Sequence, residues 1–114
     1  MKLKSKLSSK IVVVALLVGC LVGWSARADA PAAWATNCAA CHGKDGKGST
    51  MMGRRLSIKD LTDPKVQASF TDADAANDIK NGITEGGTTK MKAFGDKLSD
   101  DDIKALVAYV RTLK

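Results

Sequence analysis

The pentapeptide Cys38-Ala39-Ala40-Cys41-His42 constrains this 114-residue chain more than any other segment. Two cysteines three residues apart, followed directly by a histidine, form the attachment site of a c-type haem. On a helix the two cysteines share one face, so both thiols would meet one porphyrin edge. Each thiol would form a thioether with a haem vinyl group, and His42 would bind the iron. The pentapeptide therefore predicts one covalently bound haem c.

Two other chemistries use the same cysteine spacing. A thioredoxin-like dithiol belongs to a chain of alternating strands and helices, and strand patterns are nearly absent after residue 28. A zinc site needs four ligands, commonly a second pair of cysteines or histidines. The chain has 3 cysteines and 1 histidine, so haem is the stronger interpretation.

The first 28 residues have the pattern of an export signal. Four lysines precede an apolar run over residues 11–22, and Ala26-Arg27-Ala28 has the small residues that a signal peptidase reads. We expect a signal peptide at residues 1–28 and a mature domain at residues 29–114 in the periplasm. The alternatives are lipidation of Cys20 and retention of the apolar run as an anchor, and either would attach the domain to a membrane.

The basic character of the chain comes from its first residues. The chain has 18 basic and 12 acidic side chains, a formal net charge of +6. Five of the basic residues and none of the acidic ones lie in residues 1–28, which leaves +1 for the remainder. The basic pI is therefore no indication of nucleic-acid binding, and we expect no nucleic-acid partner.

Residues 29–114 have the pattern of a small all-α domain with long loops. A domain of this size buries little apolar surface, so a wrapped haem would complete its core, and we expect the apoprotein to be largely unfolded. Helices are expected over residues 30–40, after Thr71 and after Ser99, with one helical turn at 64–69. The last helix has an apolar stripe made by Ile103, Leu106, Val107, Val110 and Leu113. The glycine-broken segments 43–53 and 83–90 are expected to be loops.

The sixth iron ligand decides what such a haem does. His42 is the only histidine, which excludes a second histidine from the same chain. A methionine thioether is the natural candidate, because it is a soft ligand that favours ferrous iron. The long connection from His42 to Met91 allows the chain to wrap the macrocycle, whereas Met51 and Met52 follow the motif closely. The spacing favours Met91, with Met51 and Met52 as alternatives.

Three segments resemble the small class I cytochromes c, and the resemblance covers nearly all of residues 31–114. They are the haem motif with Trp34 before it and Gly43 after it, the segment Lys90-Met91-Lys92-Ala93-Phe94, and the last helix from Leu98-Ser99-Asp100-Asp101 to Ala108-Tyr109-Val110. The resemblance implies three to four helices wrapped around one covalently bound haem, with the first and last helices crossing. It implies thioethers at Cys38 and Cys41, His42 as the proximal ligand and Met91 as the distal ligand.

The chain departs from the family pattern at two places. The family often has a proline after the haem motif, whose carbonyl accepts a hydrogen bond from the proximal histidine, and another directly after the ligand methionine. No proline lies between Gly43 and Asp63, and Lys92 follows Met91. We expect Met52 or a neighbour to supply the carbonyl, and the Met91 segment to be looser than is usual.

These features predict a periplasmic one-electron carrier, not an enzyme, because a six-coordinate iron has no free site for a substrate. We expect a monomer that meets donor and acceptor redox proteins in weak encounters at a haem edge ringed by lysines. Those lysines would be Lys44, Lys47, Lys90 and Lys92. Arg54 and Arg55 would pair with the haem propionates or simply be solvent-exposed. The alternatives are a haem-based ligand-binding or sensor protein with a weak or absent methionine ligand, and a membrane-anchored haem subunit of a larger redox complex.

Overall fold

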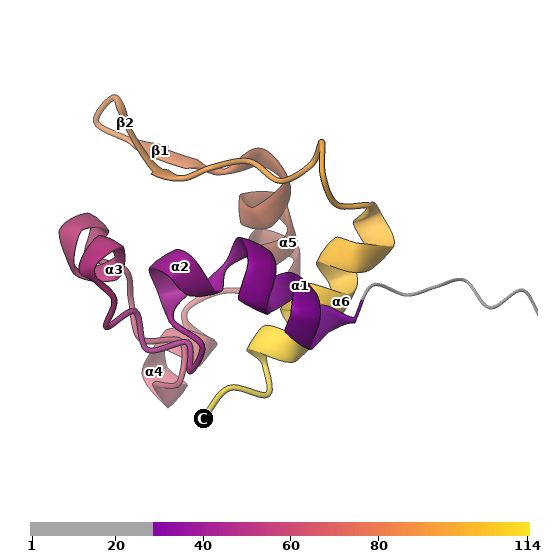
Figure 1. Cartoon of the computed structure of the whole chain (residues 1–114), viewed down its shortest axis with the longest axis horizontal. Coiled ribbons are helices and arrows are strands. Elements are labelled where there is room, and N and C mark those ends of the chain that lie inside the picture. The colour runs from indigo at the N-terminus through magenta and orange to yellow at the C-terminus, as the bar shows by residue number, and fades with distance from the viewer. Residues whose placement is uncertain (1–28) are drawn as a thin grey trace, which may run out of the picture.

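The computed structural model describes residues 29–114, so the expected signal peptide at residues 1–28, with Cys20, lies outside the described residues. Figure 1 shows a helical domain with a single two-stranded hairpin in this part of the chain. Along the chain the elements are α1 Ala30–Asn37, α2 Ala39–His42, α3 Met51–Leu56, α4 Pro64–Ala68, α5 Asp72–Asn81, β1 Ile83–Glu85, β2 Thr88–Met91 and α6 Asp100–Val110. The predicted all-α class is confirmed, and the hairpin is the exception to it.

The first helix breaks at Cys38 instead of continuing to residue 40. Cys38 has φ −117° and ψ −36°, and its N–H donates to the Trp34 carbonyl at 2.9 Å, which closes α1. α2 then carries the chain to His42 and ends at Gly43, where φ is +82°. The Gly43 carbonyl accepts a hydrogen bond from Trp34 Nε1 at 3.0 Å. The prediction of one helix over residues 30–40 is therefore wrong in its boundaries, because the motif forms a turn of its own.

Both predicted loops contain regular structure. Thr50 caps α3, since its hydroxyl accepts a hydrogen bond from the Gly53 N–H at 2.8 Å. β1 and β2 pair antiparallel through a turn at Gly86 and Gly87, both with positive φ. The loop predictions for 43–53 and 83–90 are wrong in these parts, because glycines mark the tight turns between short elements as readily as irregular loops.

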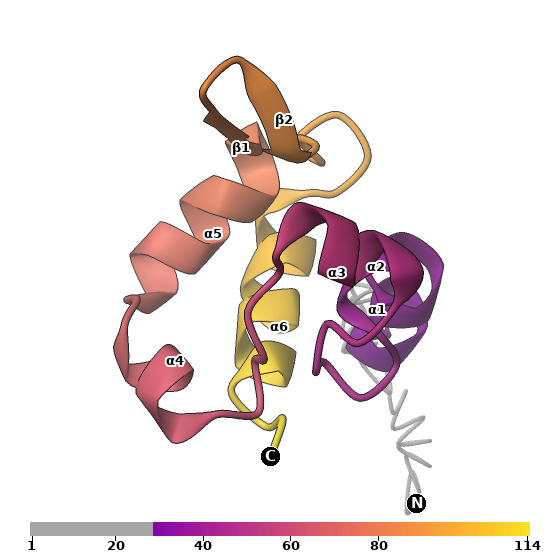
Figure 2. The ribbon, with the colours of Figure 1, turned by 90° about the vertical axis from the view of Figure 1, so that its left-hand side faces the viewer.

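α1 packs against α6, as predicted for the first and last helices (Figures 1 and 2). The rings of Trp34 and Tyr109 meet in this contact, with centroids 5.7 Å apart and planes tilted by 52°. The predicted stripe of α6 is confirmed as core, with Leu113 half-buried and four residues buried: Ile103, Leu106, Val107 and Val110. Burying an apolar side chain of this size contributes about 1.5–3 kcal/mol, so this contact is a main support of the fold.

α5 and α6 form the frame from which the hairpin extends (Figure 2). Each begins with a capping box, made by Thr71 and Asp74 in α5 and by Ser99 and Asp102 in α6. A cap of this kind contributes about 1 kcal/mol, so both helix starts are well defined. The single buried residue of α5, Ile79, lies near its end, where the chain turns into the hairpin.

Candidate haem site

The described residues surround a partly open cavity of about 460 Å³. Every helix and both strands contribute at least one side chain to its wall. The wall is largely apolar, with side chains that include Trp34, Leu56, Leu61, Val66, Phe70, Ile79 and Leu106. Cofactor sites commonly have volumes of about 300–1,000 Å³. An apolar cavity bounded by nearly the whole domain suits a cofactor around which the chain is wrapped.

The two motif cysteines lie in one helical turn, and Cys38 alone of the two lines this cavity. Both are free thiols, and Cys38 is buried and lines the cavity, whereas Cys41 is half-buried in α2. Burial, and to a smaller extent the neighbouring Cys41, raises the pKa of the Cys38 thiol to about 11. Cys38 is therefore a neutral thiol at pH 7. A reactive dithiol of the thioredoxin type needs a lowered thiol pKa, so this environment argues against that alternative.

His42 also lines the cavity, with its ring centroid 5.5 Å from that of Trp34. Burial lowers the pKa of His42, so the imidazole is neutral at pH 7, which is the form that binds a metal. Its Nδ1 is buried and has no hydrogen-bond partner in the described part of the chain, so no carbonyl near Met52 takes the expected orienting role. A neutral, cavity-lining imidazole with an unpaired ring nitrogen fits an iron ligand.

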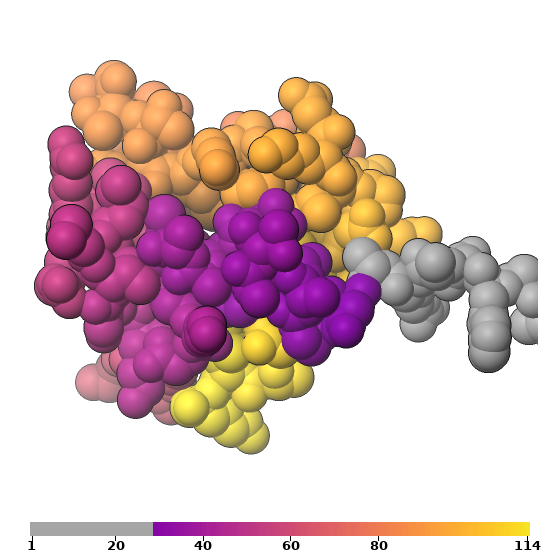
Figure 3. Space-filling view, in the orientation of Figure 1, coloured from indigo at the N-terminus to yellow at the C-terminus, as the bar shows by residue number. Residues whose placement is uncertain are grey.

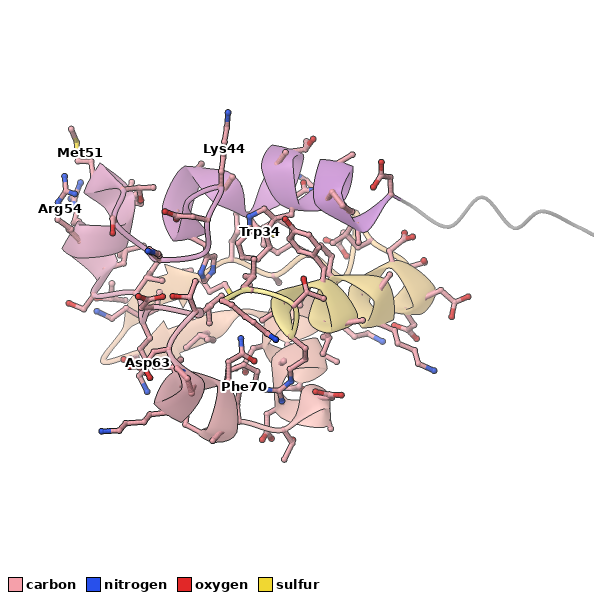
Figure 4. All side chains as sticks on the ribbon, turned by 90° about the horizontal axis from the view of Figure 1, so that it is seen from below. Trp34, Lys44, Met51, Arg54, Asp63 and Phe70 are labelled. Carbon is pink, nitrogen blue, oxygen red and sulfur yellow. The ribbon has the colours of Figure 1, made fainter. Side chains whose placement is uncertain are left out.

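Among the methionines of residues 29–114, Met91 alone lines the cavity. It is half-buried on β2. Met51 and Met52, in the first turn of α3, are 81% and 42% exposed, and Figure 4 shows Met51 projecting away from the body of the domain. The fold therefore brings Met91 to the cavity that His42 lines, although the two residues are far apart in the sequence.

Contacts on both sides hold the Met91 segment in place. In the space-filling view, the orange atoms of the hairpin and the loop after it form the upper edge of the domain (Figure 3). Before it, Gly82 has φ +75°, and a Cβ there would lie 2.6 Å from the Met91 carbonyl oxygen. After it, the Phe94 N–H donates to a carbonyl in the last turn of α5 at 2.9 Å, and the Phe94 side chain is 4% exposed. These contacts tie the segment to the end of α5, with Lys92 where the family often has proline, and its looseness relative to the family stays a prediction.

α3 supports the second motif cysteine, a role that is not predicted from the sequence. The Thr50 hydroxyl donates to the Cys41 carbonyl at 2.6 Å. Gly53 is buried, and a Cβ there would lie 2.7 Å from the same carbonyl oxygen, so only glycine permits this approach. Thr50, a residue type favoured at the start of a helix, is the sequence signal that could have indicated a short helix here.

The two arginines of α3 lie away from the cavity. Arg54 and Arg55 are exposed, the Arg54 guanidinium donates to the Ser49 carbonyl, and neither side chain lines the cavity wall. Figure 4 shows Arg54 beside Met51 at the outer end of the domain. Their placement does not support contact with haem propionates. Lys59 and Lys90 line the cavity and are the basic side chains available to carboxylates there.

The comparison with protein families decides the class of this domain. Residues 25–110 match the family described as cytochrome c oxidase, cbb3-type, subunit III, and this span includes the whole cavity wall. The chain belongs to the class I c-type cytochromes. Membership implies covalently bound haem c with its iron, and members of the family act as electron carriers or as subunits of oxidase complexes.

Relatives of this cytochrome include both oxidase subunits and a small cytochrome. It is 41% identical over 95 residues to the cbb3-type cytochrome c oxidase subunit FixP of Azorhizobium caulinodans, a match that covers 78% of this chain and 30% of the relative. The match to subunit CcoP of Azospirillum brasilense, 32% identical, covers 68% of this chain and 25% of the relative. Cytochrome c-553 of Helicobacter pylori is 33% identical over 82 residues, covering 72% of this chain and 76% of the relative. The chain thus spans less than a third of the two oxidase subunits.

A solved c-type cytochrome, KustC0563, has a similar structure. The TM-score is 0.66 at 32% sequence identity, and the match covers 75% of this chain and 98% of that one. The predicted small cytochrome c fold is therefore confirmed. Within residues 29–114, no helix has the length and apolar character needed to cross a membrane.

Proposed function

We propose that this cytochrome carries single electrons between redox proteins in the periplasm, with one haem c bound through Cys38 and Cys41 and ligated by His42 and Met91. The observation that supports this most is that His42 and Met91 line one apolar cavity, while Met51 and Met52 face solvent. A small domain whose described residues surround this cavity suits one haem.

When bound, the haem supplies a one-electron couple between ferric and ferrous iron. His42 offers a neutral imidazole, and Met91 offers a soft thioether that favours the ferrous form. The largely apolar wall limits the access of water, and the hairpin and α5 hold Met91 where it is, so little of the chain has to move when the electron arrives. His42 is the only histidine of the chain, so no second imidazole serves as a distal acid or base, which argues against an enzyme.

The surface beside α2 and α3 is the proposed contact for redox partners. Thr50 and Gly53 fix α3 against Cys41, so the exposed side chains of α3 lie close to the motif. Lys44 and Arg54 are exposed on this part of the domain, as is the apolar side chain of Met51 (Figure 4). Basic groups around an apolar centre favour brief encounters steered by charge.

The oxidase subunits among the relatives favour a second candidate, a haem subunit held permanently in a larger redox complex. The two candidates differ in what becomes of residues 1–28. The intact mass of the protein purified from cells separates them: loss of residues 1–28 supports the carrier, whereas a lipidated Cys20 or a retained first segment supports the subunit.

Visible spectra of the periplasmically expressed protein test the ligand assignment. We expect c-type bands on reduction and, in the ferric protein, the weak red-edge band of iron bound to methionine sulfur. Met91→Ala should lose that band, whereas Met51→Ala and Met52→Ala, the matched controls, should keep it.

The ligand-binding alternative predicts a different result. A high-spin ferric spectrum or rapid carbon monoxide binding by the unmodified protein would favour an iron with an open position. Persistence of the sulfur band in Met91→Ala would show that another side chain is the ligand, and the proposal would fail.

A further inference from the structure

Residues 61–70, which include α4, form one wall of the cavity, and backbone hydrogen bonds attach this wall weakly to the rest of the domain. Leu61, Val66 and Phe70 line the cavity. The Leu61 N–H donates to the Gly46 carbonyl at 2.9 Å, but every backbone hydrogen bond that the structure gives for the N–H groups of 62–70 is local. Figure 2 shows α4 on the opposite side of α6 from α1. Something other than the backbone must hold α4 against the cavity.

Two side chains, Gln67 and Arg111, join this wall to α6. Gln67 Nε2 donates to the Val110 carbonyl at 3.0 Å and also to the Leu61 carbonyl. Arg111, directly after α6, donates from Nη1 to the backbone carbonyl and the side-chain oxygen of Gln67, and from Nη2 to the Phe70 carbonyl at 2.8 Å. Its guanidinium also lies over the Phe70 ring, 4.3 Å from the centroid. We call these two residues the Gln67–Arg111 clasp.

The clasp combines several charge-assisted hydrogen bonds with the planar geometry of one guanidinium, whereas an ordinary surface ion pair is a single contact. Arg111 Nε donates to Asp72 Oδ1 at 2.8 Å, so all three guanidinium nitrogens are engaged, and the Arg111 side chain is 30% exposed. A lysine would keep the charge but lose the planar arrangement of donors. The pair Lys80–Asp100 is a single contact between side chains that are 50% and 80% exposed, and such pairs contribute little. It provides a matched control.

We propose that Gln67 and Arg111 are positioning residues for the cofactor, which hold the 61–70 wall closed and limit the access of water to the haem. The inference rests on the proposed haem site, since the wall lines that cavity. Neither Gln67 nor Arg111 is part of the cavity wall. They act through Leu61, Phe70 and Val110, which line the cavity. An open wall would admit water, which stabilises the more highly charged ferric form and lowers the reduction potential.

The experiment compares the haem-loaded protein with Arg111→Gln, Arg111→Lys, Gln67→Ala and the control Lys80→Gln. Hydrogen exchange of the backbone amides of 62–70 reports opening of the wall directly. We expect exchange there to be about tenfold faster in the three clasp variants and unchanged in the control, because each lost charge-assisted bond favours local opening. We also expect a lower midpoint potential in the clasp variants, with the iron–sulfur band of methionine retained.

The Arg111→Lys variant separates geometry from charge. If Arg111→Lys speeds amide exchange of 62–70 and lowers the midpoint potential as much as Arg111→Gln does, the clasp holds the wall. If both quantities match those of the unmodified protein, the proposal is overturned. Lower thermal stability with unchanged exchange of 62–70 and unchanged potential also overturns it. Should an Arg111 variant fail to fold, Gln67→Ala decides by the same two measurements. Failure of the ligand assignment would appear separately, as a missing sulfur band in the unmodified protein.

Discussion

Two segments of this cytochrome present methionines in opposite ways. α3 packs its backbone against Cys41 and exposes Met51 and Met52, whereas the hairpin directs Met91 to the cavity wall. The segment around Met91 is fixed by strand pairing, by Gly82 and by the buried ring of Phe94. The comparison shows that residue type alone does not bring a methionine to the cavity. The backbone that carries each methionine, and the contacts that hold that backbone, decide which one lines the wall.

The largest expected effect in this comparison comes from Phe94. Phe94→Ala would leave a cavity directly after the Met91 segment and should lower the free energy of unfolding by about 3–5 kcal/mol, with weakening of the methionine–iron band. Met52→Ala, on the exposed helix, should change the same free energy by less than about 0.5 kcal/mol. Denaturant unfolding of the two haem-loaded variants checks this. Equal losses of unfolding free energy in the two variants would contradict the contrast between the segments.

A pair of glycines sharpens the comparison within the hairpin. Gly82 and Gly86 both have positive φ, but a Cβ at Gly82 would meet the Met91 carbonyl, whereas at Gly86 it would meet nothing within 4 Å. We expect Gly82→Ala to cost about 2–3 kcal/mol more than Gly86→Ala and to weaken the sulfur band. Unfolding curves and ferric spectra of both variants measure this. If Gly86→Ala lost as much stability and as much of the sulfur band as Gly82→Ala, the positive φ alone would account for the need for glycine at both positions.

Oxidation compares the methionines without any substitution. Sulfoxide formation follows exposure of the thioether, so mild peroxide should modify Met51 first, Met52 next and Met91 last. Peptide mass analysis over a time course gives the order. Early oxidation of Met91 would contradict its half-buried placement at the cavity wall.

The smallest expected effect concerns the start of α5. This helix supports the Met91 segment, because a carbonyl in its last turn accepts a hydrogen bond from the Phe94 N–H. Hydrogen bonds from the Thr71 N–H and hydroxyl hold the pKa of Asp74 below its usual value. A carboxyl with a lowered folded-state pKa stabilises the fold above its unfolded value of about 3.9, and this contribution is lost as the pH falls through the folded value. Asp74→Asn should therefore lower the melting temperature slightly at pH 7 and not at all in strong acid. An equal difference at both pH values would contradict this origin.

Much of the site could be predicted because its residues belong to short sequence motifs. Cys38, Cys41 and His42 lie within one pentapeptide, so their shared turn needs no knowledge of the fold. The cap at Ser99 and the apolar stripe of α6 likewise need only helical geometry. The preference for Met91 rests on its distance from His42 along the chain and on the family resemblance, and its place at the cavity wall agrees with both.

The features that were missed depend on contacts between distant segments. The break at Cys38, the helix at Met51–Leu56 and the β1–β2 pairing are set by tertiary packing, which overrides the glycine signals. The bond from Gln67 to the Val110 carbonyl joins residues 43 positions apart, and no local pattern indicates it. Residue type favours Arg54 and Arg55 as partners of the propionates, but both are exposed and neither lines the cavity.

The most direct test of the ligand assignment is the proton NMR spectrum of the reduced protein with isotope-labelled methionine methyl groups. A thioether bound to ferrous haem lies over the porphyrin ring, and the ring current shifts its methyl resonance far upfield. We predict one such methionine resonance, present in Met51→Ala and Met52→Ala and absent in Met91→Ala. An upfield methyl that survives in Met91→Ala, or none in the unmodified protein, would contradict the account.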